Sequence, residues 1–229
     1  MDLSALQEDL ERELSERFAE LRFYQNQLQT RAKEQDRNML RRPLILLLYA
    51  HYEGFTKFAM DAYISAVNSE NLECANASSE MAAASMADIF AELRNPQPVS
   101  KIFRGQSPGD LRLGRFARER QFVEQAYELL KRKVEIPDNV LDTESNLNIS
   151  VLRKLLYRIG LSPELFDGFA SPIQELVQRR NLIAHGADRA GVEDAVYGRL
   201  RDRIMSVMSG ISRAIVLAAG KGEYRRVAS

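Results

Sequence analysis

The spacing of apolar side chains predicts a chain built from helices. Residues 2–36 carry one narrow apolar stripe at the three-and-four spacing of an amphipathic helix, while Glu, Gln and Arg fill most other positions. The stripe consists of Leu3, Leu6, Leu10, Leu14, Phe18, Leu21 and Leu28. We expect one long N-terminal helix that packs or dimerises and keeps its charges in solvent.

A second helix is expected from Arg41 to about Val67. Pro43 falls in its first turn, where proline is tolerated because no intrahelical amide hydrogen is needed there. The following run, Leu44–Leu48, is apolar on all sides. That pattern is typical of a central core helix.

Three residues, His51, Glu53 and Gly54, interrupt the apolar character of this second helix. A buried carboxylate needs a partner. Two compatible interpretations of Glu53 remain open: it pairs with an arginine of the core, or it pairs with Arg180 and orients a site. Gly54 would let another helix approach closely.

A basic insertion is expected at about residues 95–135, and proline and glycine mark its first half as a loop. From Lys101 to Lys133 the chain has nine Lys or Arg against four Asp or Glu. Four aromatic residues are interleaved with these charges: Phe103, Phe116, Phe122 and Tyr127. Cations follow a phosphate backbone and rings stack on bases, so this is a candidate surface for single-stranded RNA, with Arg115 and Arg118 as candidate contacts. A solvated helix with core aromatics explains the same pattern.

The rest of the chain alternates helices with short connections. The pattern predicts a connector and a shorter helix at 68–94, an extended segment at 134–143, a turn or helix cap at 144–148, a helix at 151–160 and a last long helix at 196–215. We therefore expect an N-terminal amphipathic helix at 1–38, a helical domain at 39–220 and a polar tail at 221–229.

Composition narrows the possible functions. Lys plus Arg and Asp plus Glu both number 32, so any electrostatic footprint is local. The single Cys74 excludes an intramolecular disulfide, and one cysteine with two histidines cannot supply the usual zinc ligands, so we expect no metal and no cofactor. The sequence has no signal-peptide pattern and no apolar run long enough to read as a membrane span, so we expect a cytoplasmic protein without a membrane segment.

The stretch Ile173–Gly186 carries the most reactive set of side chains. Its apolar positions predict an amphipathic helix, and Asn181 and His185, four residues apart, share one polar face with Arg180 beside them. Guanidinium matches phosphate oxygens and imidazole titrates near neutrality, so this patch suits chemistry on a phosphate. An ordinary alternative remains, because a histidine before a glycine is also what the C-terminus of a helix favours.

Four stretches together resemble the HEPN superfamily, and within it the MAE_28990/MAE_18760-like branch. The four stretches are Arg41–Phe55, Thr143–Asn148, Leu152–Leu161 and Leu176–Gly186. The resemblance covers about residues 40–215. Its core pattern, Arg, a polar residue, three further residues and His, is met by Arg180, Asn181 and His185. Tyr52 stands where relatives are expected to carry Trp.

The resemblance implies an all-α HEPN-type helical bundle that forms a homodimer, with the Arg-Asn-x-x-x-His helices of two subunits facing each other across one cleft. It also implies a metal-independent endoribonuclease, acting as a toxin neutralised by an antitoxin protein or in anti-phage defence. RNA can be cut in this way when its 2′-hydroxyl attacks the neighbouring phosphorus, which requires proton transfer and positive charge at the phosphate. A symmetric dimer would supply two histidines and two arginines to such a site.

The resemblance and the side-chain chemistry together suggest roles. Arg180 would stabilise the phosphate charge, His185 would transfer protons or position the 2′-hydroxyl, and Asn181 would hold the phosphate or orient His185. Glu53 would brace Arg180, and His51 is a weaker candidate for substrate contact. The competing functions are a non-catalytic module of the same fold that binds RNA or a protein partner, and a purely structural helical protein.

Overall fold

The computed structural model describes residues 1–31, 33–94, 111–137, 140–187 and 189–226, and within these ranges it contains helices and two isolated bridges but no strands. The elements are α1 (Leu3–Gln29), α2 (Glu34–Asn68), η1 (Cys74–Asn76), α3 (Ser79–Ser85), α4 (Ala87–Arg94), α5 (Leu111–Lys131), α6 (Ile149–Arg158), η3 (Asp167–Phe169), α7 (Ala170–Ala184) and α8 (Asp194–Lys221). The prediction of an all-α fold is confirmed.

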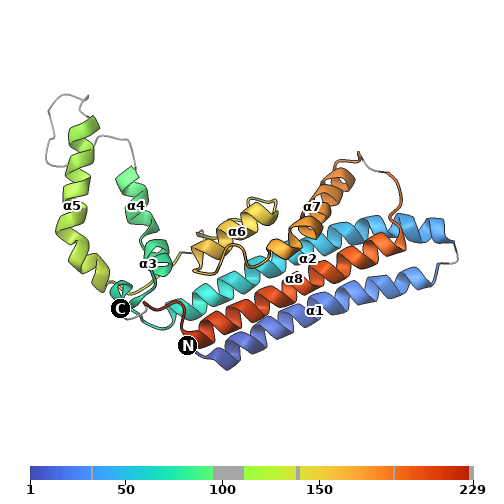
Figure 1. Ribbon diagram of the computed structural model, residues 1–229, viewed down its shortest axis with the longest axis horizontal. Helices are drawn as coiled ribbons and strands as arrows, with labels where there is room; N and C mark the ends of the chain where they lie inside the picture. Colours follow the sequence, from blue (N-terminus) through green and yellow to red (C-terminus); the bar gives the residue numbers. More distant parts are fainter. Residues whose placement is uncertain (32, 95–110, 138–139, 188, 227–229) are drawn as a thin grey trace.

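Three long helices form the body of the molecule. α1, α2 and α8 lie side by side along its length, and α7 packs against both α2 and α8 (Figure 1). α6 lies between α3 and α7, while α3, α4 and α5 stand at the end of the molecule where the two chain termini lie (Figure 1). The continuous apolar core lies between the long helices and extends under α6 and α7.

α1 is an integral part of this core. Asp2 caps the helix by accepting a hydrogen bond from the Ala5 amide at 3.0 Å. One face of the helix is buried against α2 and α8, and consists of Leu6, Leu10, Leu21 and Leu28. The apolar stripe was expected either to pack or to dimerise, and the first helix packs within its own chain.

The boundary between the first two helices differs from the prediction. α1 ends at Gln29 and α2 begins at Glu34, so residues 34–40 belong to the second helix and Pro43 lies inside it. Proline chemistry alone favours a helix that starts just before Pro43, because an interior proline loses one backbone hydrogen bond. Contacts with α8 outweigh that preference.

Arg41 provides those contacts. Its side chain is buried and its Nη1 donates to Asn38 Oδ1 at 2.5 Å and to Glu34 Oε1 at 2.9 Å. Its Nη2 pairs with Asp194 at the start of α8, at 2.8 Å. The two hydrogen bonds from arginines, first from Arg41 and then from Arg37, lower the pKa of Glu34. Arg41 thus links Glu34 and Asn38 in the first turns of α2 and connects α2 with the start of α8.

The last helix and the residues after it also belong to the fold. α8 is long and apolar enough, by length and composition, to cross a membrane, and in this structure its apolar side is buried mainly against α1 and α2. After α8, Tyr224 is buried and donates to Glu70 Oε2 at 2.9 Å, and Arg225 pairs with the same carboxylate. The segment expected as a polar tail is therefore docked as far as Arg226, and residues 227–229 lie outside the described residues.

Candidate functional site

The C-terminal end of α7 carries the three residues of the phosphate-binding prediction. Ile173, Leu176 and Val177 are buried and fix the helix on the core. The helix stops at Gly186, which has a left-handed φ of 69°. The Gly186 amide donates to Ile183 O at 3.1 Å and the Ala187 amide to Leu182 O at 2.9 Å, the two bonds of a Schellman cap. The chain therefore turns away sharply just after His185.

Arg180 is held in one position by three groups. Its Nη1 donates to Asn181 Oδ1 at 2.9 Å, and its Nη2 donates to the Ser145 carbonyl at 2.9 Å. The guanidinium lies over the Tyr49 ring, 3.9 Å from the ring centre. Such stacking favours a cation and limits its motion. Arg180 is therefore partly buried and preorganised, although α7 alone leaves its side chain free to rotate.

The turn before α6 supplies the carbonyl that Arg180 contacts. Glu144 and Ser145 both have positive φ, at 54° and 51°. Immediately after them the Leu147 amide donates to Tyr49 Oη at 2.8 Å, and Asn148 caps α6 by accepting from the Ser150 and Val151 amides. The turn or helix cap predicted at 144–148 is confirmed, and its function in the fold is to connect Tyr49 with Arg180.

Tyr49 is the residue beneath the site that sequence reasoning did not single out. Burial raises the pKa of Tyr49, opposed by the Leu147 amide and the Arg180 guanidinium, so the hydroxyl stays protonated. Ser145 was likewise missed as an Arg180 partner. A signal for both was present, because the Tyr49 and Ser145 segments are two of the four stretches that carry the family resemblance.

Replacing Tyr49 by Phe should destabilise the protein by about 1 to 3 kcal/mol, because the buried Leu147 amide loses its acceptor. Tyr52→Phe is the matched control. The Tyr52 hydroxyl is buried on the same helix and has no hydrogen-bond partner within the described ranges, so its removal should be close to neutral. Denaturant melts of the two variants measure the difference, and equal losses would contradict this assignment.

The expected ion pair between Glu53 and Arg180 is not formed, and Glu53 makes no ion pair with any other residue that the structure describes. Arg180 donates instead to Ser145 and Asn181, and Glu53 Oε1 is buried without a hydrogen-bond partner in the described part of the chain. Glu53 does lie near the site, because its negative charge helps to raise the pKa of both Tyr49 and Tyr52. Its supporting role through a direct pair with Arg180 is therefore wrong.

His51 points to the opposite side of α2, which corrects its assignment as a substrate contact. Its ring is buried between α1 and α2, with Nε2 3.3 Å from Glu20 Oε2 and Nδ1 3.4 Å from Arg17 Nη1. Residues two positions apart on an α-helix point in directions that differ by about 200°. His51 therefore cannot share a face with Tyr49. Gly54 was expected to let another helix approach closely, and the group beside it is the Arg17 guanidinium of α1 rather than a helix backbone.

Burial lowers the pKa of His51 below its ordinary value of 6.5, with Arg17 adding to the effect and Glu20 opposing it. The unfolded chain therefore binds a proton at a higher pH than the folded one, and stability is lost as the pH falls through about 6.5. His51→Gln should flatten this part of the pH profile of the free energy of unfolding. The measurement is the free energy of unfolding of the wild type and of His51→Gln across this pH range, and identical slopes in the two proteins would refute the assignment.

His185 occupies the last position of the α7 cap and its side chain is exposed. Its backbone amide donates to the Asn181 carbonyl at 3.0 Å, one turn earlier. Among the described residues, the Arg180 side chain donates to Asn181 and Ser145 and not to the imidazole. His185 thus occupies the position before a capping glycine that a helix C-terminus favours for histidine. This position leaves the imidazole accessible to a ligand that reaches Arg180 and Asn181.

Arg115 and Arg118 are not brought to this site within one chain. Both lie on α5, at the far end of the molecule from α7 (Figure 1). Arg115 is exposed and pairs with Glu119 at 2.8 Å, whereas Arg118 is half-buried in the groove between α4 and α5. Lys101 and Arg104 of the basic insertion lie outside the described residues.

The helical bundle and the Arg-Asn-x-x-x-His sequence at the end of α7 define the protein as a HEPN domain. The chain belongs to the MAE_28990-like HEPN family, whose model matches residues 6–224, nearly the whole chain. The match is longer than the resemblance at 40–215 and includes α1 and α5. Searches of curated proteins and of solved structures found no match. Membership of this family suggests a nuclease-type or RNA-related module.

Proposed function

We propose that the protein is a metal-independent endoribonuclease whose catalytic residues are Arg180, Asn181 and His185. The observation that carries this proposal is the fixed position of the Arg180 guanidinium, between the Tyr49 ring, the Ser145 carbonyl and Asn181, next to an exposed histidine. A preorganised cation stabilises charge that develops in a transition state without having to reorganise. Family membership agrees with this, because the superfamily generally contains ribonucleases.

The chemistry needs no group beyond those of the protein and the RNA. The 2′-hydroxyl attacks the adjacent phosphorus and the 5′-oxygen leaves, which gives a 2′,3′-cyclic phosphate. Arg180 stabilises the negative charge on the phosphate oxygens, while His185 accepts or donates a proton in the transfer. The Asn181 side-chain amide is positioned by Arg180 and holds the phosphate.

Dimerisation completes the site in this proposal. One exposed histidine per chain supplies either the proton acceptor or the proton donor, and a twofold axis beside α7 brings a second one opposite. Leu182 is about half exposed on the same last turn and offers an apolar contact for the second copy. We further propose that the enzyme acts as a toxin or an anti-phage effector restrained by a protein partner.

Four buried polar atoms, on α2, on the turn before α6 and on Arg180 itself, support a ligand site at the end of α7. Tyr52 Oη, Glu53 Oε1, Asn146 Oδ1 and Arg180 Nε have no hydrogen-bond partner among the residues that the structure describes. Buried groups of this kind are rare and concentrate where water or a ligand binds.

The test is RNA binding and cleavage by the purified protein in EDTA, with His185→Ala beside the wild type. The proposal predicts fragments from the wild type, and intact but bound RNA from His185→Ala. Binding without cleavage by both proteins would identify a non-catalytic RNA-binding module instead. Neither binding nor cleavage by the wild type, on a panel of single-stranded and structured RNAs, would contradict the proposal.

A further inference from the structure

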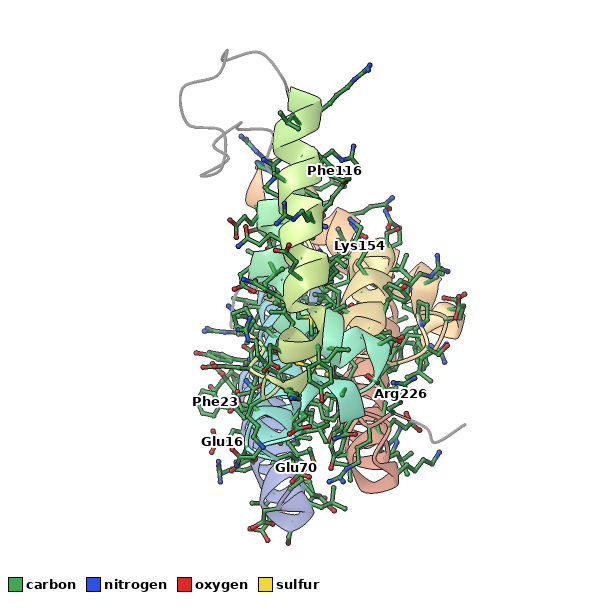
Figure 2. The ribbon with its side chains drawn as sticks, turned by 90° about the vertical axis from the view of Figure 1, so that its left-hand side faces the viewer. Glu16, Phe23, Glu70, Phe116, Lys154 and Arg226 are labelled. Atoms are coloured by element: carbon green, nitrogen blue, oxygen red, sulfur yellow. The ribbon has the colours of Figure 1, made fainter. Side chains whose placement is uncertain are left out.

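One face of α5 exposes four large apolar side chains, and the Lys131 ammonium of the same helix lies over one of them, the Tyr127 ring, 3.8 Å from its centre. Phe116, Val123, Tyr127 and Leu130 have exposed fractions of 62%, 72%, 68% and 45%. Figure 2 looks onto this end of the molecule, where the labelled Phe116 projects from α5. A contiguous apolar surface on a helix marks an interaction site more often than a solvated surface.

The spacing of this stripe is that of a coiled-coil seam. Phe116, Val123 and Leu130 are seven residues apart, and Tyr127 follows Val123 by four. The same alternation of three and four places Leu113 and Arg120 in the seam. A continuous seam from 113 to 130 is about 26 Å long at the helical rise per residue.

The opposite face of α5 packs within the chain. Phe122 lies against Phe90 of α4, with ring centres 6.1 Å apart, and Gln125 and Leu129 line the same groove. The seam residues are on the other side of the helix by the 100° rotation per residue. α5 therefore uses one face to hold α4 and presents the second face outward.

We propose that this seam binds α5 of a second copy of the chain in antiparallel orientation. Arg120 decides the direction. A parallel pair places Arg120 directly against Arg120 of the other copy, with two like charges in the seam. An antiparallel pair with Phe116 opposite Tyr127 places Arg120 opposite Val123 of the second copy, next to its Glu124. Arg120 and Glu124 can then exchange their ion pair, 2.7 Å within one chain, for two symmetric pairs between chains.

The charges along α5 favour the same arrangement. The first half, residues 111–121, carries four arginines and one glutamate, whereas residues 122–131 carry two glutamates and one lysine. Antiparallel pairing sets the positive half of each helix against the negative half of the other, which lowers its energy and specifies direction. RNA would match the arginine-rich half alone and would leave the apolar seam uncovered.

This contact is separate from the α7 contact of the proposed function and does not depend on it. α5 and α7 lie at different ends of the molecule (Figure 1). If a chain uses both the α5 seam and the end of α7, two assemblies are possible. Each copy contacts two different neighbours, or one dimer is held by both contacts. Cross-links between cysteines on α5 therefore test this contact independently of RNA cleavage.

The experiment mixes two single-cysteine proteins, Phe116→Cys and Tyr127→Cys, each in a full-length Cys74→Ser background and one of them carrying a size tag. Cys74 is the only native cysteine and is buried. Under mild oxidation we expect a link between the two different proteins and little between identical ones. Phe23→Cys, on an exposed part of α1, measures random collision.

A charge swap makes the test sharper. Arg120→Glu should reduce the mixed link several-fold by placing two like charges together, and Arg120→Glu combined with Glu124→Arg should restore it. Links between identical proteins only would overturn the antiparallel arrangement. No link above the Phe23→Cys control would overturn the proposal, and RNA cross-links to α5 in its place would identify a nucleic-acid surface.

Discussion

Arg180→Ala should lower the rate of RNA cleavage by about a hundredfold or more. Removal of one preorganised group that stabilises transition-state charge typically costs a factor of 10² to 10³. Arg180 meets the conditions for such an effect, because the Tyr49 ring and the Ser145 carbonyl hold its guanidinium at the exposed end of α7. Single-turnover cleavage with enzyme in excess measures the chemical step directly.

The neighbouring arginine is a matched control. Arg179→Ala removes the same side chain one position earlier, where its Nε pairs with Glu175 at 3.0 Å. We expect cleavage within a few-fold of the wild type. Arg180→Lys keeps the charge but loses the planar fork and the stacking, so it should remain strongly impaired. Equal losses from Arg179→Ala and Arg180→Ala would mean that general positive charge, and not this site, supports cleavage.

Phe55→Ala should reduce the free energy of unfolding by about 3 to 5 kcal/mol, the cost typical of removing a buried phenylalanine. Phe55 is fully buried on α2, the helix that contacts α1, α7 and α8. The cavity would lie at the centre of the bundle, where the packed helices cannot close it. Urea unfolding followed by circular dichroism provides the measurement.

The same substitution at Phe23 is the control for this stability effect. Phe23 is on α1, is 58% exposed and contacts Tyr24 edge to face. Its replacement by alanine should cost about 1 kcal/mol or less, since exposed positions contribute little and the single ring contact is weak. A loss at Phe23 as large as that at Phe55 would show that α1 packs differently from the structure described.

The sequence predicted the elements whose stability is local and periodic. The apolar spacing of α1, α2, α6 and α8 is strong, and Gly186 marks the end of α7 because a left-handed residue is required there. The start of α2 could not be predicted from local chemistry. Pro43 favours a later start, and the buried contacts of Arg41 with Asp194, 153 positions away, overcome it.

For the candidate site, the sequence predicted residues of one helix but not the groups that they contact. Arg180, Asn181 and His185 follow from spacing on α7, whereas the partners of Arg180 come from α2 and from the turn before α6. Glu53 is the instructive error, because charge pairing suggested it. Tyr49, one turn earlier, instead presents its ring to the guanidinium, which periodicity cannot distinguish from ordinary core packing.

For His51, too, the sequence did not predict which helix the side chain contacts. It lies two residues from Tyr49 in sequence, and the rotation of an α-helix directs it to α1 and not to α7. The exposed face of α5 is a further case, because its aromatic residues were expected either to bind RNA or to enter the core. Phe122 does pack against α4, while Phe116 and Tyr127 remain outside.

The most direct test of the central claim is the chemistry of the cut ends. A single-stranded RNA should be incubated with the wild-type protein in EDTA, beside a copy with one 2′-deoxyribose at the main cleavage position. We expect 2′,3′-cyclic phosphate and 5′-hydroxyl ends from the first RNA, and no cut at the deoxy position in the second. Cleavage at the deoxy position, or products with 5′-phosphate ends, would contradict attack by the 2′-hydroxyl and with it the role assigned to Arg180 and His185.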